Sequence, residues 1–170
     1  MKDVELKVLC ELMRDGRKSD RDLAKAIGVS QPTVSSFRKK LEAEGIIQEY
    51  TVIPDFRKLG YEILAVTFIK LRGDLNPEEI EKARKIMSTS PEIILFQRGT
   101  GWITEAIVVS LHHSFSSYRS LIERMKNYPF VDLSETRNFM ISLRDEMPYR
   151  PLTLKTLAQH VLAHQDGNTE

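Results

Sequence analysis

The sequence of 170 residues is poor in the features that cross-link, anchor or strongly charge a protein. It has one cysteine, Cys10, which excludes a disulfide framework and a metal site built on several thiolates. It has no hydrophobic run of membrane-spanning length and no signal peptide, so we expect an intracellular, cytoplasmic protein without a membrane partner. The formal net charge is only +1, from 25 basic and 24 acidic residues, so bulk charge cannot supply affinity for a polyanion.

Sites for metals and cofactors are also scarce. His160 and His164 lie four residues apart, but no carboxylate stands at ligand spacing, so we interpret the histidines as solvated side chains. Gly99-Thr100-Gly101 lacks the further glycine and the strand-to-helix context of a dinucleotide loop, and a tight hairpin fits it better. We therefore predict neither a metal nor a cofactor.

Two short helices joined by a tight turn are predicted at the start of residues 19–53. Ser19 can cap the first helix, which Gly28 ends as a left-handed residue. Ser30 can cap a second helix, from Gln31 to Glu44. The apolar stripes of the two helices are Leu23, Ala26 and Ile27, then Val34, Phe37 and Leu41.

The other face of the second helix carries an amide, hydroxyls and cations, which suit base edges and phosphates in a major groove. The candidate DNA-binding residues are Gln31, Thr33, Ser35, Ser36, Arg38, Lys39 and Lys40. The alternative is a capped helical hairpin with a solvated face. A predicted strand over Ile46–Ile53 favours the DNA-binding interpretation, because it would belong to a two-stranded wing beside the helices.

A helix from Val4 to Arg14 completes a winged helix-turn-helix domain over residues 1–53. Residues 1–58 hold twelve Lys or Arg against ten Asp or Glu. Because this excess is small, affinity for double-stranded DNA must come from local clusters and from two copies of the site in a dimer.

A second domain of different periodicity is predicted after a hinge over residues 54–61. Strands over Ile63–Leu71, Ile93–Gln97, Ile103–Leu111 and Val131–Ile141 alternate with two helices in the order βαββαβ. This order is typical of a ferredoxin-like fold over residues 62–147, so the chain is of the α+β class. The first strand is apolar on both faces, which favours a homodimer through the face that the helices leave open. The alternative is a sheet face that simply tolerates apolar residues.

The chain resembles the prokaryotic Lrp/AsnC ("feast/famine") family of transcription regulators, in an archaeal-type form. The resemblance covers about residues 3–145 and rests on the stretch 20–41 and on Gly45-Ile46-Ile47, Glu49-Tyr50-Thr51, Ile53-Pro54-Asp55 and Leu59-Gly60-Tyr61. It implies an N-terminal DNA-binding domain and a C-terminal domain that binds a small-molecule effector such as an amino acid. It also implies homodimers that assemble further into tetramers or octamers.

Two departures from the family pattern concern its functional residues. Where the family often has a cation and then an aliphatic residue, this chain has Phe37 and then Arg38, so Arg38 is expected to be released toward DNA. Where the family often has Gly, two residues and then Asp, Gly101 is followed by Trp102, Ile103 and Thr104. These residues change the charge and the volume of the effector pocket that the resemblance implies.

The same resemblance implies an effector and assembly loop over Gly99–Glu105. We expect Gly99 and Gly101 to adopt conformations that only glycine takes without strain. Trp102 would anchor an assembly surface, and Thr104 and Glu105 would line the pocket beside it. The alternative places Trp102 over its own sheet edge.

A tail over residues 148–170 is expected to form an amphipathic helix that folds back on the domain or packs on a partner subunit. The two prolines before the helix favour packing between subunits. The sequence therefore predicts an oligomeric, sequence-specific DNA-binding transcription regulator and no enzyme. The alternatives are an enzyme that resembles siroheme decarboxylases on the same architecture, and a sensing oligomer that does not bind DNA.

Overall fold

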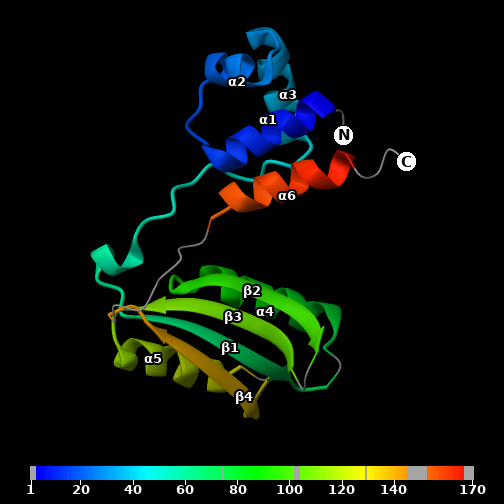
Figure 1. The fold of residues 1–170 in the computed structure, drawn as a ribbon. Helices are drawn as coiled ribbons and strands as arrows, with labels where there is room; N and C mark the ends of the chain where they lie inside the picture. The colour runs from blue at the N-terminus through cyan, green and yellow to red at the C-terminus, as the bar shows by residue number, and fades with distance from the viewer. Residues whose placement is uncertain (1–2, 74, 102–103, 129, 145–152, 167–170) are drawn as a thin grey trace. The chain divides into compact units, whose positions relative to one another are not determined.

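The computed structural model describes residues 3–73, 75–101, 104–128, 130–144 and 153–166 (Figure 1). The chain forms two compact units, one from Met1–Ile53 together with Arg150–Glu170, the other from Pro54–Tyr149. We call them the helical unit and the sheet unit. In the part of the chain that the structure describes, no helix combines the length and the apolarity needed to cross a bilayer.

The helical unit contains the three predicted helices, α1 (Asp3–Arg14), α2 (Asp20–Ile27) and α3 (Gln31–Ala43). The Ser19 hydroxyl accepts a hydrogen bond from the Asp22 N–H, and Gly28 ends α2 at φ 81°, so both predicted helix boundaries are confirmed. Apolar residues from all three helices form one core, built from Val8, Leu12, Leu23, Ala24, Val34 and Leu41.

The predicted strand over Ile46–Ile53 is wrong, because residues 46–53 contain no strand. After Gly45, at φ 67°, the N–H groups of Ile46 and Ile47 donate to the carbonyl of Leu41 at 2.9 and 3.0 Å. The chain therefore caps the end of α3 instead of extending away from it. A strand also needs a neighbour for its backbone groups, and the described residues of this unit contain no strand to pair with.

The tail helix α6 (Lys155–Asp166) packs along α1 of its own chain (Figure 1). The preference for packing between subunits is therefore wrong. The reason is that α1 is apolar on two sides. Val8 and Leu12 join the core with α2 and α3, whereas Leu6 and Cys10 lie against Ala158 of α6.

The sheet unit has the predicted βαββαβ order. A short 3₁₀ turn, η1 (Phe56–Leu59), precedes the first strand. The elements are β1 (Ile63–Leu71), α4 (Pro77–Thr89), β2 (Ile93–Gly101), β3 (Thr104–His112), α5 (Phe115–Lys126) and β4 (Val131–Ser142). The sheet is antiparallel in the order β2-β3-β1-β4, which confirms the ferredoxin-like fold. A capping box at Asn76 and Glu79 starts α4, as the Asn-Pro-Glu-Glu stretch suggests.

The two faces of this sheet differ as the alternation in β1 predicts. Ala65, Ile69 and Leu71 are buried on the face that α4 and α5 cover. The opposite face carries Leu64, Val66 and Phe68, and their register partners on β4 continue it with Ile141 and Phe139. Phe139 is 61% exposed in the single chain, so this open face presents a large apolar side chain that α4 and α5 do not cover.

Candidate functional site

Helix α3 is fixed at its N-terminus by local hydrogen bonds. The Ser30 hydroxyl accepts from the Thr33 N–H at 3.3 Å, and the two hydroxyl oxygens lie 2.7 Å apart. Gly28 and Val29 turn the chain between α2 and α3, where the Val29 N–H donates to the carbonyl of Ala24 at 3.1 Å. Local sequence therefore sets where α3 begins and which side chains lie on its outer face.

The outer face of α3 is polar and accessible. Gln31, Ser36 and Lys39 are exposed, and Thr33 and Ser35 are half-buried. The Lys39 ammonium has no hydrogen-bond or ion-pair partner in the described part of the chain. This face thus offers an amide, hydroxyls and one uncommitted positive charge.

The other two cations of the predicted cluster have acidic partners inside the helical unit. Arg38 Nη2 donates to the Lys18 carbonyl at 2.9 Å, and its Nε lies 3.0 Å from Oδ1 of Asp20. Lys40 Nζ lies 2.7 Å from a carboxylate oxygen of Glu5, whose hydrogen bond raises the pKa of Lys40. Contact of these two cations with DNA stays a prediction.

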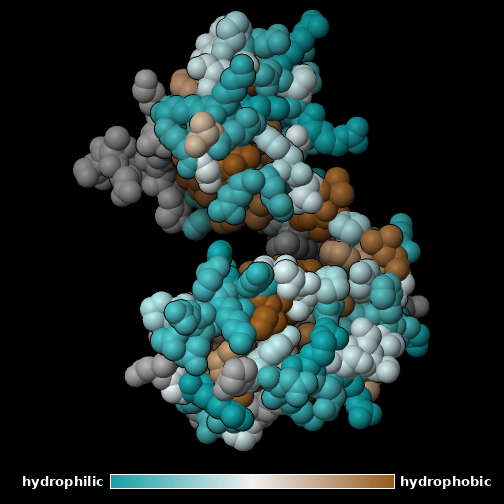
Figure 2. All heavy atoms as spheres, turned by 180° about the vertical axis from the view of Figure 1, so that it is seen from behind, coloured by the Kyte–Doolittle hydropathy of each residue, from teal (hydrophilic) through white to brown (hydrophobic). Residues whose placement is uncertain are grey.

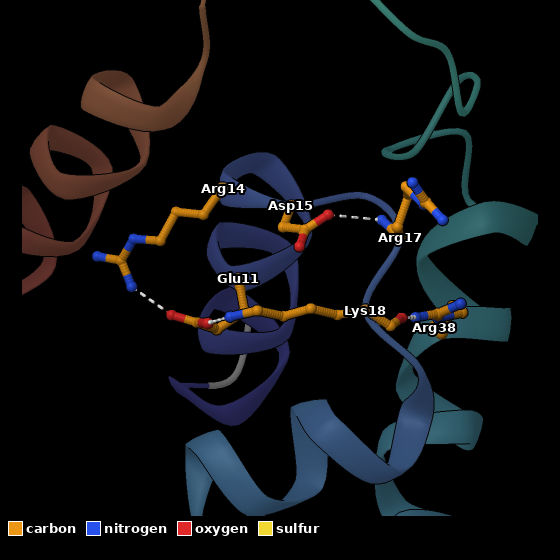
Figure 3. A network of polar contacts seen from close by, with 6 residues as sticks. All are labelled: Glu11, Arg14, Asp15, Arg17, Lys18 and Arg38. Atoms are coloured by element: carbon orange, nitrogen blue, oxygen red, sulfur yellow. Dashed lines mark hydrogen bonds and ion pairs between the residues drawn. The ribbon is translucent and has the colours of Figure 1, made fainter.

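The contacts of Arg38 continue into a wider polar network (Figure 3). The Lys18 carbonyl accepts a hydrogen bond from Arg38, and the Lys18 ammonium donates one to Glu11 on α1 at 2.5 Å. Glu11 also pairs with Arg14. The hydrogen bond from Lys18 is the largest cause that lowers the pKa of Glu11. One loop residue, Lys18, therefore connects α1 with α3.

Tyr50 covers this network from the segment that follows α3. The Arg38 guanidinium carbon lies 5.8 Å from the centre of the Tyr50 ring, and the Tyr50 hydroxyl donates to Glu42 at 2.8 Å. Burial and that hydrogen bond raise the pKa of Tyr50 to about 12. The tyrosine is therefore a neutral hydroxyl donor at neutral pH.

The acidic partner of Lys40, Glu5, and the three residues that contact Arg38, which are Lys18, Asp20 and Tyr50, were not predicted as site residues. Only Glu5 carries a periodic signal, because it precedes the buried Val8 and Leu12 by three and seven residues and so lies on the apolar side of α1. The other three meet Arg38 through the tertiary fold, which helical spacing does not encode.

The predicted effector loop is described only in part. Gly101 pairs with Thr104 across the β2–β3 hairpin and has φ 157°, at the edge of the region that favours glycine. The prediction for Gly99 is wrong. Strand β2 extends to Gly101, and Gly99 lies within it without a positive φ, where the pairing with β3 shifts register between Arg98 and Gly101. Trp102 and the Thr104 side chain lie outside the described parts of the chain, and Glu105 accepts a hydrogen bond from the Leu71 N–H at 3.0 Å.

The sheet unit also contains a pocket, and its charged lining is largely committed to internal ion pairs. An open groove of about 520 Å³ in the sheet unit is lined by charged side chains that already pair, Arg57 with Asp55 and Arg144 with Glu62. Among the described residues, no group of three His, Cys, Asp or Glu side chains is arranged to hold a metal ion.

Comparisons with known proteins point the same way. A family profile described as winged helix-turn-helix DNA-binding matches residues 1–48. An uncharacterized HTH-type transcriptional regulator of Pyrococcus furiosus is 31% identical over 83% of this chain and 90% of its own length. An HTH-type transcriptional regulator of Mycobacterium tuberculosis is 25% identical over 86% of this chain and 96% of its own.

Solved structures share the fold over nearly the whole chain. A transcriptional regulator of Neisseria meningitidis in complex with L-Met has a TM-score of 0.72 at 16% identity, covering 92% of this chain and 99% of that one. LrpC of B. subtilis has a TM-score of 0.67 at 23% identity, covering 88% and 99%. AsnC of E. coli has a TM-score of 0.67 at 19% identity, covering 88% and 97%.

Proposed function

Because this chain belongs to the Lrp/AsnC family of helix-turn-helix transcription regulators, we propose that it binds a specific duplex DNA sequence as a homodimer, with α3 in the major groove. The relatives that it matches are transcription regulators, and the chain is a regulator rather than an enzyme. The observation that carries the proposal is the outer face of α3, where Gln31, Ser36 and Lys39 are exposed. A sensing oligomer without DNA binding would have no use for such a face.

Each candidate DNA-binding residue of α3 except Arg38 has a role in this proposal. Gln31, Ser35 and Ser36 meet base edges, because amides and hydroxyls can donate and accept there. Lys39 meets phosphate as a point charge, with Thr33 and Lys40 at the edges of the same contact. The base contacts confer specificity, and the phosphate contacts confer salt-sensitive affinity.

The open face of the sheet unit supports the homodimer. Phe139, Ile141 and Leu95 are exposed large apolar residues of β4 and β2, and each lies on the side of the sheet that α4 and α5 do not cover. A second copy offers the same apolar surface, so an isologous contact buries both faces at once. Two α3 helices in one particle then double the phosphate contacts, which a chain of net charge +1 needs.

The β2–β3 hairpin is proposed as the effector and assembly site. A related regulator from Neisseria meningitidis is seen in complex with L-Met, and we propose a small effector such as an amino acid for this chain too. Gly101, Thr104 and Glu105 would line its pocket, and Trp102 would anchor contacts between dimers in a tetramer or octamer. Glu105 supports this role, because its bond to the Leu71 N–H fixes a carboxylate at the base of the hairpin.

Salt-dependent DNA binding tests the proposed function. A duplex selected from a random pool by the wild-type protein is titrated at several salt concentrations, with Lys39→Ala as the variant. Loss of one phosphate contact per subunit should lower the slope of log affinity against log salt by about one per subunit.

The matched control is Lys82→Ala, which removes an exposed lysine from α4 of the sheet unit. It should leave affinity and slope unchanged. Equal slopes for the wild type and Lys39→Ala would remove Lys39 from the interface, and failure to select any duplex would reject the DNA-binding function.

A further inference from the structure

We propose that Arg38 is a positioning residue for DNA recognition, holding α3 against α2 and the preceding loop rather than contacting DNA itself. The proposal rests on the proposed function, because it concerns the same recognition helix. It gives Arg38 a role different from the phosphate contact that the sequence predicts.

The Arg38 guanidinium makes three contacts within the helical unit: a hydrogen bond, an ion pair and a contact with an aromatic ring. One edge donates to the Lys18 carbonyl at 2.9 Å, another faces the Asp20 carboxylate at 3.0 Å, and the Tyr50 ring lies 5.8 Å from the guanidinium carbon. The Arg38 and Asp20 side chains are each only 23% exposed. Two of the three Arg38 guanidinium nitrogens, Nη2 and Nε, face Lys18 and Asp20, whereas the ammonium of Lys39 next to it is exposed and uncommitted.

The partners of Arg38 lie where they can fix the direction of α3. Asp20 is the first residue of α2, and Lys18 belongs to the loop before it. Arg38 stands in the second half of α3, far from the Ser30 cap that fixes the other end. Helix α3 is thus fixed near its N-terminus by the Ser30 cap and in its second half by Arg38. Two contacts at separate positions restrict rotation of the helix about either one.

The planar fork of arginine suits this geometry better than any other side chain. It reaches a carbonyl and a carboxylate in different directions at the same time, whereas a lysine ammonium on a flexible stem acts as a point charge. A phosphate contact needs only the positive charge, so Arg38→Lys separates the two roles.

The Lys18 carbonyl that receives Arg38 is itself held in place. The Lys18 ammonium lies 2.5 Å from Glu11 on α1, and the Glu11 side chain is 15% exposed (Figure 3). The path from Arg38 through Lys18 to Glu11 therefore ties α3 to α1, and the contact of Arg38 with Asp20 adds α2. The base-reading face of α3 is positioned by residues that do not lie on that face.

Asp20→Asn gives the sharpest test, because the two roles predict opposite signs. If Arg38 positions α3, loss of the Asp20 charge weakens the contact that holds α3 in place. The affinity for the selected duplex should then fall by about tenfold. The slope against salt should stay unchanged, as should affinity for a scrambled duplex of the same length. If Arg38 contacts phosphate instead, removing a negative charge and freeing Arg38 raises affinity for both duplexes.

Two further full-length variants complete the experiment. Arg38→Lys should lose affinity for the selected duplex as Asp20→Asn does, although its charge is kept. Asp22→Asn is the matched control, because it removes a carboxylate from the same turn of α2, where that group accepts from the Ser19 hydroxyl at 2.6 Å. It should leave the ratio of selected to scrambled binding as in the wild type.

The outcomes separate this proposal from the proposed function. If the wild type selects no duplex, the DNA-binding function and the role of Arg38 both fail. If it selects a duplex and Asp20→Asn binds it as tightly or more tightly, the positioning role alone is overturned. Circular dichroism of each variant at the binding temperature confirms that the compared proteins are folded.

Discussion

The helical unit and the sheet unit are built on opposite plans. In the helical unit a small apolar core is surrounded by paired charges, and Lys18, Glu11 and Arg38 join the helices at partly exposed positions. In the sheet unit two helices and one sheet face share a single apolar core, and the other sheet face stays apolar and uncovered. In the view of Figure 2 the surface of both units is largely hydrophilic, with hydrophobic side chains confined to limited areas.

This difference shows how one chain can face two kinds of partner. Internal pairing of Arg38 and Lys40 leaves Lys39 and a few polar groups on the outer face of α3, which suits a polar partner that must be read by specific contacts. A bare apolar sheet face cannot discriminate in that way, but it gains free energy from any apolar surface that matches it. In the proposed function, specific recognition and assembly therefore fall to different units.

The largest effect is expected at the open sheet face. Phe139→Asp places a charge where the proposed dimer buries an aromatic ring, and it does so twice in an isologous interface. We expect the dimerisation constant to weaken by at least about a hundredfold, or roughly 3 kcal/mol. Sedimentation of the full-length protein at micromolar concentration measures it.

Asn138→Asp is the matched control, since it is also exposed and adds the same charge at the next position, on the other side of β4. It should remain a dimer. A wild-type protein that sediments as a monomer, or a Phe139→Asp variant that stays dimeric, would contradict dimerisation through this face.

An intermediate effect is expected from pH, through a polar group inside the sheet unit. His112 is fully buried, with Nε2 2.9 Å from the Ser110 hydroxyl and Nδ1 3.3 Å from that of Ser117. Burial lowers the pKa of His112 below its ordinary 6.5. The unfolded state therefore binds a proton at His112 more readily than the folded state does. The contribution of His112 to the free energy of unfolding is fully present above about pH 6.5 and is lost as the pH falls below that value.

Urea unfolding at pH 7.5 and pH 5 measures this loss. His112→Gln removes the titrating group and should make the free energy of unfolding less dependent on pH over that range. His113→Gln, in which an exposed histidine is replaced, should keep the wild-type dependence. Equal pH dependence in all three proteins would show that His112 is not its source.

The smallest effects are expected from a pair of glycines, one in each unit. Gly28→Ala forces a side chain into the left-handed conformation that ends α2 and should cost about 1 kcal/mol. Gly99→Ala should change stability by less than about 0.5 kcal/mol, because a Cβ there meets nothing within 4 Å and Gly99 does not have a positive φ. Urea unfolding compares the two, and a larger cost at Gly99 would show that its geometry had been misjudged.

The sequence predicts best what is decided over a few residues. Ser19, Gly28 and Asn76 mark helix ends through their own hydrogen bonds and dihedral angles, so their roles are readable before any tertiary structure exists. The alternation in β1 likewise reveals two apolar faces, because strand side chains point to opposite sides in turn.

The sequence-based predictions that are wrong concern residues whose structure depends on partners far away in the sequence. The residues after Gly45 have the composition of a strand, but a strand forms only beside another, and the described residues of the helical unit contain none. The place of α6 depends on a second apolar side of α1 that no local pattern assigns to it. The contacts of Arg38 likewise depend on Lys18 and Asp20, which reach it only through the turn between α2 and α3.

The packing of α6 on α1 also has a consequence for the order in which the protein is completed during synthesis. The elements of the sheet unit all lie within Pro54–Tyr149, so this unit can fold once β4 has left the ribosome. Leu6 and Cys10 of α1 can meet Ala158 of α6 only after the residues of the sheet unit that lie between them in the sequence have been synthesised. This contact therefore has a much higher contact order than the core that α1 forms with α2 and α3.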